Sequence, residues 1–351
     1  MTLPNGEIEE NFSFHRFDVI SDDSDHHFVS SNLPKKNGRH PFANASGGSP
    51  KKIMQEWKIL EKHLPESIFV RAYENRIDLL RAVIVGATGT PYHDGLFFFD
   101  LAFPADYPAR PPMVYYRSFG LRLNPNLYAN GRVCLSLLNT WTGKKSEKWN
   151  PNESTVLQVL ISIQALVLNE KPYFNEPGHS MWPGRTIWEK KSTAYNEDVF
   201  VLSCKSMIFS LRKPPKNFEA FVSRHFRDRA HVILSACKNY MSGGVRVGYY
   251  RNDEPSFCSS SSDSIVDASE KFKGLILQLY PELVTAFAKT GASLGTLGEQ
   301  LKVERRTTSF KGEELNKKKE KKTTSGIALA HKVFGKMKAA LGLKKDGVKA
   351  R

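Results

Sequence analysis

The sequence predicts an α+β fold: a four-stranded antiparallel meander with an N-terminal helix, a central helix and extended C-terminal helices, between disordered tails. Three observations lead to this prediction. Four short segments between residues 68 and 116 are rich in β-branched and aromatic side chains, as strands are. The segments on either side space their apolar residues as amphipathic helices do. Short connections join the strand segments, and such connections favour antiparallel neighbours.

The order of the elements follows from local patterns. Apolar residues recur at helical spacing from Ile53 to Leu60, so the first helix is expected to begin near Lys51 and to end before Pro65. The expected strands are Ile68–Tyr73, Ile77–Val85, Leu96–Phe103 and Met113–Tyr116. The expected later helices are Ser154–Leu168, Thr186–Leu211, Phe218–Met241 and Lys271–Lys289, the last with Pro281 as a kink.

Composition divides the chain into five expected parts. Residues 1–48 are polar and rich in turn formers, which predicts a disordered segment. The second part is a folded core over 49–245, the expected catalytic domain. It is followed by a Ser-rich linker over 246–267, an accessory amphipathic helix over 268–293 and a basic tail over 294–351. Within the first part, residues 17–28 mix acids with spaced apolar side chains. We interpret this stretch as a solvated tail, and a short docking motif is the alternative.

The positive charge belongs mainly to the tail. Of a formal net charge of +15, residues 302–351 carry +11, because they hold 16 Lys or Arg against 5 Asp or Glu. Three interpretations remain open for this tail: solvated charge, a nuclear-import patch, or an amphipathic face for an acidic partner or an anionic membrane surface. Nucleic-acid binding ranks lowest, because no aromatic residues are interleaved with these charges to stack on bases.

Several classes of protein are disfavoured by what the sequence lacks. The sequence contains no run of 18 or more apolar residues, so no membrane span is expected. Residues 1–8 have no apolar stretch typical of a signal peptide. Four widely spaced cysteines, Cys134, Cys204, Cys237 and Cys258, show no metal-ligand spacing, so neither a metal site nor a disulfide framework is expected. A reducing compartment, the cytoplasm or the nucleus, suits free thiols.

One cysteine lies in an irregular segment with turn signals. Cys134 follows an Asn124-Pro125-Asn126 turn and a glycine-containing loop, and apolar residues flank it. Alone, such a thiol is expected to be buried and inert, since free cysteine is among the most buried residue types. The alternative is a nucleophile that acts as thiolate and forms an acyl intermediate. No histidine lies within 30 residues of it, but a thiol that receives an already activated acyl group needs no such base.

Motifs around this thiol form a recognisable set. Phe103-Pro104 opens a turn that continues to Pro108, Pro111-Pro112 follows, and Cys134 comes eight residues after Asn126. Together they resemble the active-site half of ubiquitin-conjugating enzymes, and the resemblance extends from residue 51 to residue 241. The runs 91–100, 133–138 and 171–178 are similar to a branch of large members, some of which are conjugating enzyme and ligase in one chain. Its plant members also share the acidic segment 24–27.

The resemblance implies roles for six residues. Cys134 would accept the C-terminus of ubiquitin as a thioester, and Asn126 would support the loop and stabilise the oxyanion when a lysine attacks. Asn124 stands where the family usually has histidine, beside Pro125, and Ser136 stands where many relatives have an acid. Glu176 resembles the acidic residue that follows the central helix in the family.

The resemblance also implies contact surfaces. Lys51, Lys52 and Lys58 on the first helix would meet the activating enzyme, although lysines on a helix are usually a solvated face. Phe103, Trp149 and Pro151 would meet a ligase. For the two aromatic residues the alternative is a place in the core.

We therefore expect an enzyme that transfers ubiquitin to lysines of protein substrates, with ubiquitin, the activating enzyme and a ligase as partners. It is expected to need no cofactor and no metal, because ATP is consumed upstream by the activating enzyme. Two alternatives stay open: a catalytically silent scaffold that binds ubiquitin or a partner, and an enzyme for another ubiquitin-like modifier.

Overall fold

The computed structural model describes residues 14–30, 48–179, 184, 186–243, 245–250 and 268–295. The chain divides into a unit of residues 1–294 and a second unit of residues 295–351. Gly295 is the described part of the second unit. Nearly all of the predicted basic tail, with its three interpretations, therefore lies outside the described residues, as do Cys258 and the predicted linker from residue 251 onward.

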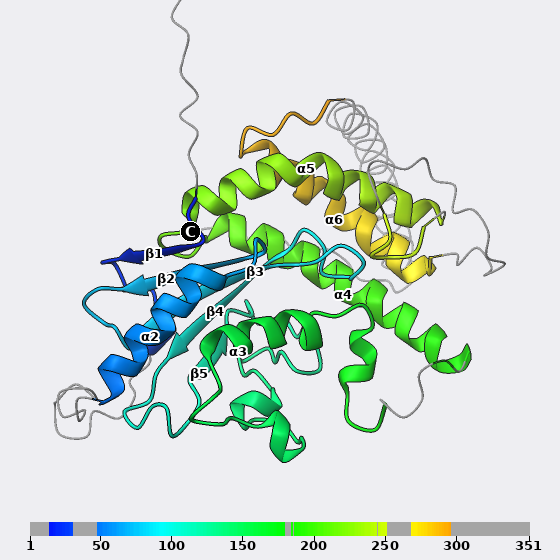
Figure 1. Ribbon diagram of the computed structural model, residues 1–351. Helices are drawn as coiled ribbons and strands as arrows, with labels where there is room; N and C mark the ends of the chain where they lie inside the picture. The colour runs from blue at the N-terminus through cyan, green and yellow to red at the C-terminus, as the bar shows by residue number, and fades with distance from the viewer. Residues whose placement is uncertain are drawn as a thin grey trace, which may run out of the picture. The chain divides into compact units, whose positions relative to one another are not determined.

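A five-stranded sheet in the order β1-β2-β3-β4-β5 forms the centre of the first unit (Figure 1). The strands are β1 (Phe17–Ile20), β2 (Ile68–Tyr73), β3 (Leu79–Val85), β4 (Leu96–Ala102) and β5 (Met113–Tyr116). Strands β2 to β5 form an antiparallel meander, whereas β1 pairs in parallel with β2. The predicted α+β fold and its four-stranded meander are confirmed, and one further strand extends the sheet.

Two strand ends differ from the prediction. β3 begins at Leu79 rather than Ile77, because Arg76 and Asp78 form a tight turn closed by two hydrogen bonds of 2.9 and 2.8 Å between guanidinium and carboxylate. β4 ends at Ala102 rather than Phe103, whose amide donates instead to the carbonyl of Asp78.

Apart from the short α1, which was not predicted, the helices of the described residues follow the predicted order. They are α1 (His27–Ser30), α2 (Gly48–His63), α3 (Val156–Ser162), α4 (Thr186–Arg212), α5 (Glu219–Ser242) and α6 (Glu270–Ala288). The predicted helix of residues 154–168 is divided, since a π-helical turn, η4 (Ile163–Val167), continues α3. Thr155 and Gln158 cap α3 reciprocally: each backbone amide donates to the other side chain, at 3.0 and 3.2 Å.

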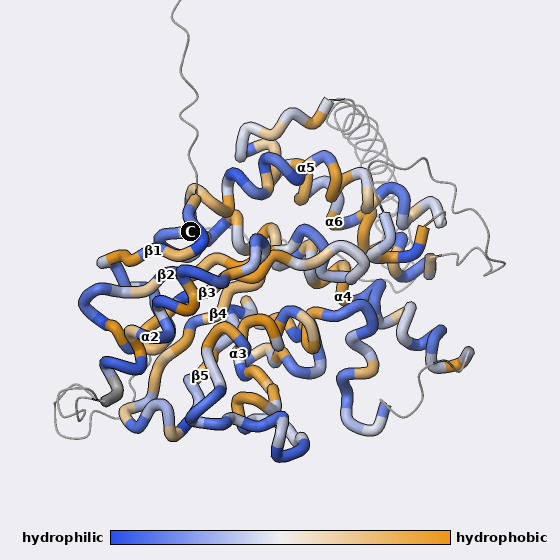
Figure 2. Tube along the Cα trace, viewed as in Figure 1, coloured by the Kyte–Doolittle hydropathy of each residue, from blue (hydrophilic) through white to orange (hydrophobic). Residues whose placement is uncertain are grey.

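One face of the sheet carries the main apolar core. Val70, Ala82 and Phe99 on this face belong to one buried cluster with Ile53 of α2 and Val159 of α3. Figure 2 shows apolar residues along the central strands and α3. Period-2 alternation within the strands sends these side chains to the same face, so α2 and α3 pack there.

A buried glutamate joins three parts of this core. Glu56 of α2 accepts a hydrogen bond from the Tyr107 hydroxyl at 2.8 Å and another from the backbone amide of Val156 at 2.9 Å. Burial raises the pKa of Glu56. The carboxyl therefore fixes α2 to the Phe-Pro turn and to the first turn of α3, where a helix leaves amides without internal partners.

Helices α4, α5 and α6 pack against one another (Figure 1). Ser269, the N-cap of α6, donates from its amide and hydroxyl to Glu197 of α4 at 3.0 and 2.5 Å. The predicted linker start is wrong, because residues 245–250 pack on the β3–β4 connection. Gly248 donates to the Tyr240 hydroxyl and accepts from Gly89, both at 3.0 Å. Its φ of +96° and its closeness to the Thr90 backbone require glycine.

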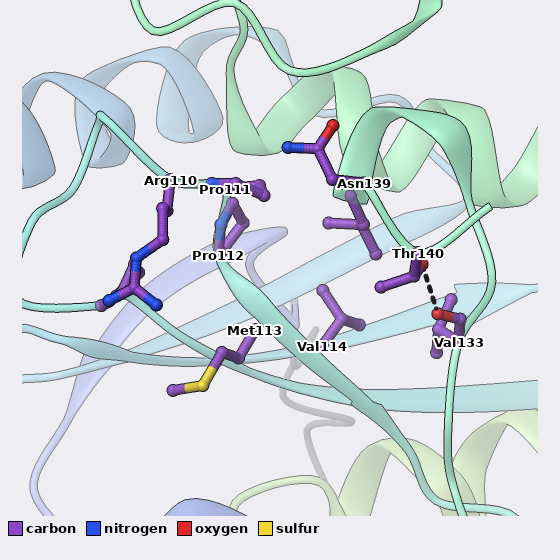
Figure 3. A pocket seen from close by; sticks show the side chains of 10 residues that line it. Arg110, Pro111, Pro112, Met113, Val114, Val133, Asn139 and Thr140 are labelled. Atoms are coloured by element: carbon purple, nitrogen blue, oxygen red, sulfur yellow. Dashed lines mark hydrogen bonds between the residues drawn. The ribbon is translucent and has the colours of Figure 1, made fainter. Parts of the chain in front are cut away.

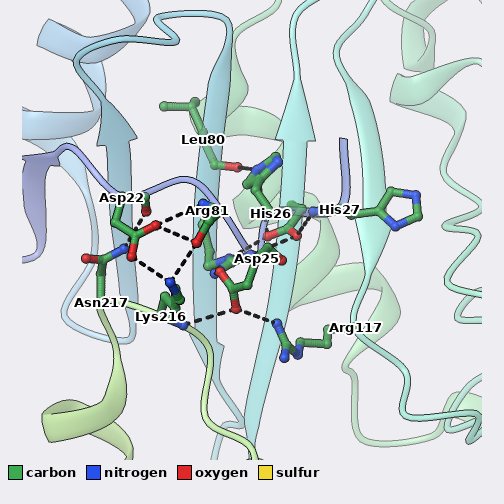
Figure 4. Close-up of polar contacts among 11 residues, drawn as sticks. Asp22, Asp25, His26, His27, Leu80, Arg81, Arg117, Lys216 and Asn217 are labelled. Atoms are coloured by element: carbon green, nitrogen blue, oxygen red, sulfur yellow. Dashed lines mark hydrogen bonds and ion pairs between the residues drawn. The ribbon is translucent and has the colours of Figure 1, made fainter. Parts of the chain in front are cut away.

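Residues 14–30, the N-terminal strap, cross the sheet (Figure 4). After β1, the His26 Nε2–H donates to the Leu80 carbonyl of β3 at 3.0 Å. The amide of His27 donates to Asp100 of β4 at 2.8 Å. The His27 ring then stacks on Tyr115 of β5 with centroids 3.5 Å apart. Burial lowers the pKa of His26, which favours the neutral ring. The strap thus reaches from the β2 edge to β5.

A buried arginine holds the strap in place. Arg81 of β3 is 0% exposed, and its guanidinium donates to both oxygens of Asp100 at 2.6 and 3.0 Å. A further N–H donates to Asp25 of the strap at 2.6 Å. Burial penalises the charged guanidinium, but the two carboxylates outweigh it and raise the pKa of Arg81. Arg117 pairs with the second oxygen of Asp25 at 3.2 Å, so two cations face two anions.

The strap also contacts the loop between α4 and α5. Lys216 pairs with Asp22 at 2.8 Å, and the side-chain amide of Asn217 donates to the Asp22 carbonyl at 2.9 Å (Figure 4). The prediction of a disordered, solvated tail is therefore wrong for residues 14–30. Its residues are held by ion pairs and backbone hydrogen bonds, which a search for apolar periodicity does not detect. The rest of residues 1–48, apart from the start of α2 at Gly48, lies outside the described residues.

We predict that Asp25→Ala lowers the free energy of unfolding by about 2–4 kcal/mol, because the buried Arg81 loses one of its two anions. Urea titration measures this, with Glu66→Ala at an exposed position before β2 as the control that leaves the midpoint unchanged. An Asp25→Ala midpoint equal to that of the unchanged chain would contradict the role of the strap.

The Asp25 carboxylate also makes the stability of the fold depend on pH. Burial acts to raise the pKa of Asp25, but Arg81 outweighs it, so the folded-state pKa lies below its usual 3.8. A depressed pKa stabilises the fold above the unfolded value, and this stabilisation is lost as the pH falls through the folded value. Asp25→Ala is therefore expected to weaken the loss of stability below about pH 4.

Candidate active site

The turn of residues 124–126 is fixed from within by a buried amide. The Asn124 Nδ2 donates to the Tyr92 hydroxyl at 2.8 Å and to the Val167 carbonyl at 2.7 Å. Its Oδ1 accepts from the backbone amide of Asn126 at 2.8 Å. The Tyr92 hydroxyl in turn donates to the Leu123 carbonyl at 3.0 Å, and complete burial raises its pKa. The turn is thereby joined to the β3–β4 connection and to the end of η4.

Two hydrogen bonds join this turn to Cys134. The amide of Cys134 donates to the Asn126 carbonyl at 2.9 Å, and the Asn126 Nδ2 donates to the Cys134 carbonyl at 2.8 Å. The Asn126 side chain is therefore held on the backbone of the cysteine, eight residues further along the chain. Among the residues that the structure describes, its buried Oδ1 has no hydrogen-bond partner.

The backbone on both sides of Cys134 is also fixed. The Thr140 hydroxyl accepts from the Leu135 amide at 3.0 Å and donates to the Val133 carbonyl at 2.8 Å. Sequence reasoning missed Thr140 because a threonine in a polar loop carries no motif. It also missed Tyr92 as the partner of Asn124, although the run 91–100 contributed to the family resemblance.

Cys134 itself is 2% exposed. An acyl carrier needs an accessible thiol, whereas this residue is nearly covered and agrees with the buried alternative. Cys204 and Cys237 are fully buried in α4 and α5, and burial raises the pKa of Cys204 well above its usual value. Cys134 differs from them in its place, because it lies in an irregular segment next to exposed Arg132 and half-buried Ser136.

Ser136 fixes the loop that follows the thiol. Its hydroxyl donates to the Thr142 carbonyl at 2.9 Å. Gly143 lies so close that a Cβ added there would come within 2.5 Å of the Ser136 oxygen. The hydroxyl at position 136 thus holds the backbone of residues 142–143.

A cavity of about 260 Å³ adjoins the active-site segment on the side of the proline-rich turn (Figure 3). It is lined by Pro104, Arg110, Pro111, Pro112, Met113, Val114, Val133, Leu138, Asn139 and Thr140. Figure 3 shows Thr140 bonded to Val133 at its edge. The cavity therefore lies between the start of β5 and the active-site segment, which contributes Val133 before Cys134 and residues 138–140 after it.

Comparison with known proteins decides the family. A family model described as ubiquitin-conjugating enzyme matches residues 52–202, which include the turn and the thiol. Ubiquitin-conjugating enzyme E2 38 of Arabidopsis thaliana is 49% identical over 286 residues, which are 81% of this chain and 84% of that protein. The chain belongs to the ubiquitin-conjugating enzyme family.

Two further relatives are longer than this ubiquitin-conjugating family member. Ubiquitin-conjugating enzyme E2 23 of Arabidopsis thaliana is 50% identical over 283 residues, 81% of this chain and 25% of the relative. The dual E2 ubiquitin-conjugating enzyme/E3 ubiquitin-protein ligase BIRC6 of Homo sapiens is 36% identical over 251 residues, 67% of this chain and 5% of the relative. The chain thus spans a quarter or less of these two proteins. The predicted similarity to plant members and to a conjugating-enzyme/ligase hybrid is confirmed.

Glu176 of this ubiquitin-conjugating family member lies near the start of the turn segment. Its carboxylate pairs with Arg122 at 3.7 Å, and both side chains are about half exposed. The preceding Asn175 donates from Nδ2 to the Val167 carbonyl at 3.1 Å and to the Asn124 Oδ1 at 3.4 Å. The structure therefore connects Glu176 to the Asn124 turn through its neighbour, and a catalytic role for its carboxylate stays a prediction.

The residues predicted to contact partners divide into exposed and buried sets. Lys51 and Lys58 are exposed on α2, and Lys52 is partly buried. Phe103 is 2% exposed, and the Trp149 indole donates to the Pro108 carbonyl at 2.7 Å from a position that is 8% exposed. This burial favours the alternative that both aromatic residues belong to the core. Pro151 is partly buried, and the partner contacts stay predictions.

The described ranges hold neither a candidate metal site nor a candidate membrane helix. These residues contain no group of three or more His, Cys, Asp or Glu placed to hold a metal ion. No helix of the described part is both long and apolar enough to cross a bilayer.

We predict that Asn124→Ala destabilises the fold by about 1–3 kcal/mol, because the Val167 carbonyl, the Tyr92 hydroxyl and the Asn126 amide lose a buried partner together. Thermal unfolding measures the effect. Asn152→Ala, at an exposed position of a loop, is the matched control and should leave the midpoint unchanged. Equal midpoints for the two variants would remove Asn124 as the organising residue of the turn.

Proposed function

We propose that this chain accepts ubiquitin as a thioester on Cys134 from the activating enzyme and transfers it to lysines of protein substrates. The observation that carries the proposal is the pair of hydrogen bonds between Asn126 and Cys134, which fix an amide side chain beside the cysteine. Membership of the ubiquitin-conjugating family supports the choice of modifier.

The proposed reaction consists of two acyl transfers. The Cys134 thiolate attacks the thioester carbonyl of activated ubiquitin, a new carbon–sulfur bond forms, and the thiolate of the activating enzyme leaves. A substrate amine then attacks the same carbonyl, the Cys134 thiolate leaves, and the amine loses a proton as the amide bond forms. No cofactor or metal takes part in either step, because ATP was spent upstream when ubiquitin was activated.

Asn126 is proposed to act during the second transfer. One N–H of its side chain donates to the Cys134 carbonyl, which holds the carboxamide against the reacting residue. A carboxamide nitrogen has two hydrogens, so a second N–H remains to donate to the oxyanion of the tetrahedral intermediate. Glu176 is proposed to attract or orient the incoming amine from the far end of the Asn124 turn.

Burial of Cys134 supports a second candidate, a silent scaffold that keeps the fold to bind ubiquitin or a partner. The Cys134 residue is 2% exposed, so little of its surface is open to an incoming thioester. The charging proposal therefore requires Cys134 to become more exposed when the activating enzyme docks.

The proposed partners follow from the family. The activating enzyme would dock on the exposed lysines of α2, and a ligase would dock near Pro151, with protein substrates reaching the thiol. We place the protein in the cytoplasm or nucleus. The basic tail would add an acidic partner or an anionic membrane surface, and nucleic acid is not proposed as a partner.

The charging reaction tests the proposal. With activating enzyme, ATP and ubiquitin, the full chain should form an adduct that a reducing agent cleaves. Cys134→Ser should give an adduct that resists reduction, because an oxygen ester replaces the thioester, and Cys134→Ala should give none. Ubiquitin binding without any adduct would establish the scaffold instead, and a panel of other modifiers with their activating enzymes distinguishes the modifier.

Asn126→Ala should separate charging from transfer. We expect transfer from preformed thioester to free lysine to slow by about 10²–10³, the range for removal of one oxyanion donor, while charging changes much less. Single-turnover discharge followed by gel electrophoresis measures both rates, and thermal unfolding shows whether the variant is folded. Equal slowing of both steps in a folded variant would indicate that Asn126 positions the loop and gives no help to the oxyanion.

A further inference from the structure

A strongly basic loop follows the active-site segment. The basic loop, residues 142–148, is exposed along its whole length. It contains Lys144, Lys145 and Lys148 against the single acid Glu147, so its formal charge is +2. The proposed transfer reaction assigns these residues no role.

Both ends of the basic loop are anchored, the first at the active-site segment and the second in the core. At its start, the Ser136 hydroxyl holds the Thr142 carbonyl at 2.9 Å, and Gly143 packs against the Ser136 side chain. At its end, the following residue Trp149 is anchored in the core by its hydrogen bond to Pro108 at 2.7 Å. A 3₁₀ turn, η3 (Lys145–Glu147), shapes the middle. The lysines are therefore presented from a defined position, although their side chains reach into solvent.

The lysines of the basic loop are not neutralised by ion pairs within the described residues. The Glu147 carboxylate accepts a hydrogen bond from the backbone amide of Lys144 at 3.1 Å and so stabilises η3. Within the described ranges, none of the three ammonium groups forms an ion pair. By contrast, Lys171, Lys216 and Lys271 elsewhere on the surface each pair with a carboxylate.

The loop is also near the reacting atom. Ser136 comes two residues after Cys134, and two residues of extended chain span at most about 7 Å. Because the Ser136 hydroxyl is hydrogen-bonded to the Thr142 carbonyl, the start of the basic loop is close to the thioester that the proposed function places on Cys134. A peptide whose lysine attacks there can reach the loop with residues a few positions away, since each residue spans about 3.3–3.6 Å.

We infer that the basic loop selects acceptor lysines flanked by acidic residues, an inference that rests on the proposed function. A cationic acceptor is repelled by the loop, whereas an acidic neighbour on the same peptide pairs with Lys144 or Lys145 and offsets the repulsion. The positive loop also lowers the pKa of an approaching ammonium, which increases the share of the neutral amine that attacks. Such exposed charges act over roughly a Debye length of about 8 Å, so the selectivity decreases with salt.

Discharge of preformed thioester on the full chain tests the inference. Three short peptides that differ in the residues beside one lysine, with Asp, Ser or Arg as neighbours, are compared with free lysine. At low salt the Asp peptide should react about three- to tenfold faster than the Ser peptide, the range for one or two exposed ion pairs, and the Arg peptide should react slowest. At high salt the three rates should converge.

Charge variants identify the loop as the cause. Lys144→Glu with Lys145→Glu should reverse the order of the peptides, and Lys144→Arg with Lys145→Arg should keep it. The arginine pair also removes both lysines as acceptors of ubiquitin, so a retained order excludes self-modification of the loop as the cause. Lys213→Glu with Lys289→Glu, a matched charge change at exposed residues at the ends of α4 and α6, should leave the order unchanged.

The outcomes separate this inference from the proposed function. Normal charging and discharge to free lysine, with equal rates for the three peptides, would overturn the role of the basic loop and leave the proposed function standing. An order that survives the glutamate pair would also overturn it. Absence of any thioester would overturn both.

Discussion

The side-chain amide of Asn124 is the interaction on which the geometry of the site depends. Its nitrogen donates to Tyr92 and Val167, and its oxygen accepts from Asn126 and, at 3.4 Å, from Asn175. The Val167 carbonyl can only accept and the Asn126 amide can only donate, so the orientation of the side chain is determined. One buried group therefore places the turn, the end of η4 and the β3–β4 connection together.

Two further polar centres hold the frame around this turn. Glu56 joins α2 to α3 on one face of the sheet, and Arg81 joins the strap to β4 on the other. Each lies in a buried position where an unpaired group would be costly, and each has its partners on different elements. The apolar core supplies the bulk of the burial, and these centres determine which elements meet across it.

The meander and the long helices could be predicted because their patterns are local. Strand residues such as Val83 and Phe98 follow β propensity, and the stripe on α2 repeats at helical spacing. The strap could not be predicted in this way. Its strand has four residues, and Asp25 is paired with a cation that lies 56 positions away in the sequence. Charge pairing over that distance leaves no periodic trace, so the segment resembles a solvated tail.

The site was predictable to a similar extent. The positions of Asn126 and Cys134 followed from resemblance, and their two hydrogen bonds agree with the expected spacing. Burial of Cys134 and of Phe103 were alternatives that the sequence raised without deciding between them, and the use of Ser136 to hold the next loop was not predicted. Each depends on which distant segments pack nearby, and motif spacing along one chain does not contain that information.

The position of the strap affects where this protein can be cut into parts. The match to the family begins at residue 52, whereas residues that complete the sheet begin before residue 20. A fragment that begins at residue 52 and keeps the rest of the chain would retain the thiol and its turn but would open one face of the sheet to water, with a guanidinium that has lost half of its counter-charge. Poor solubility of such a fragment would then report on the missing segment and would be uninformative about the enzyme.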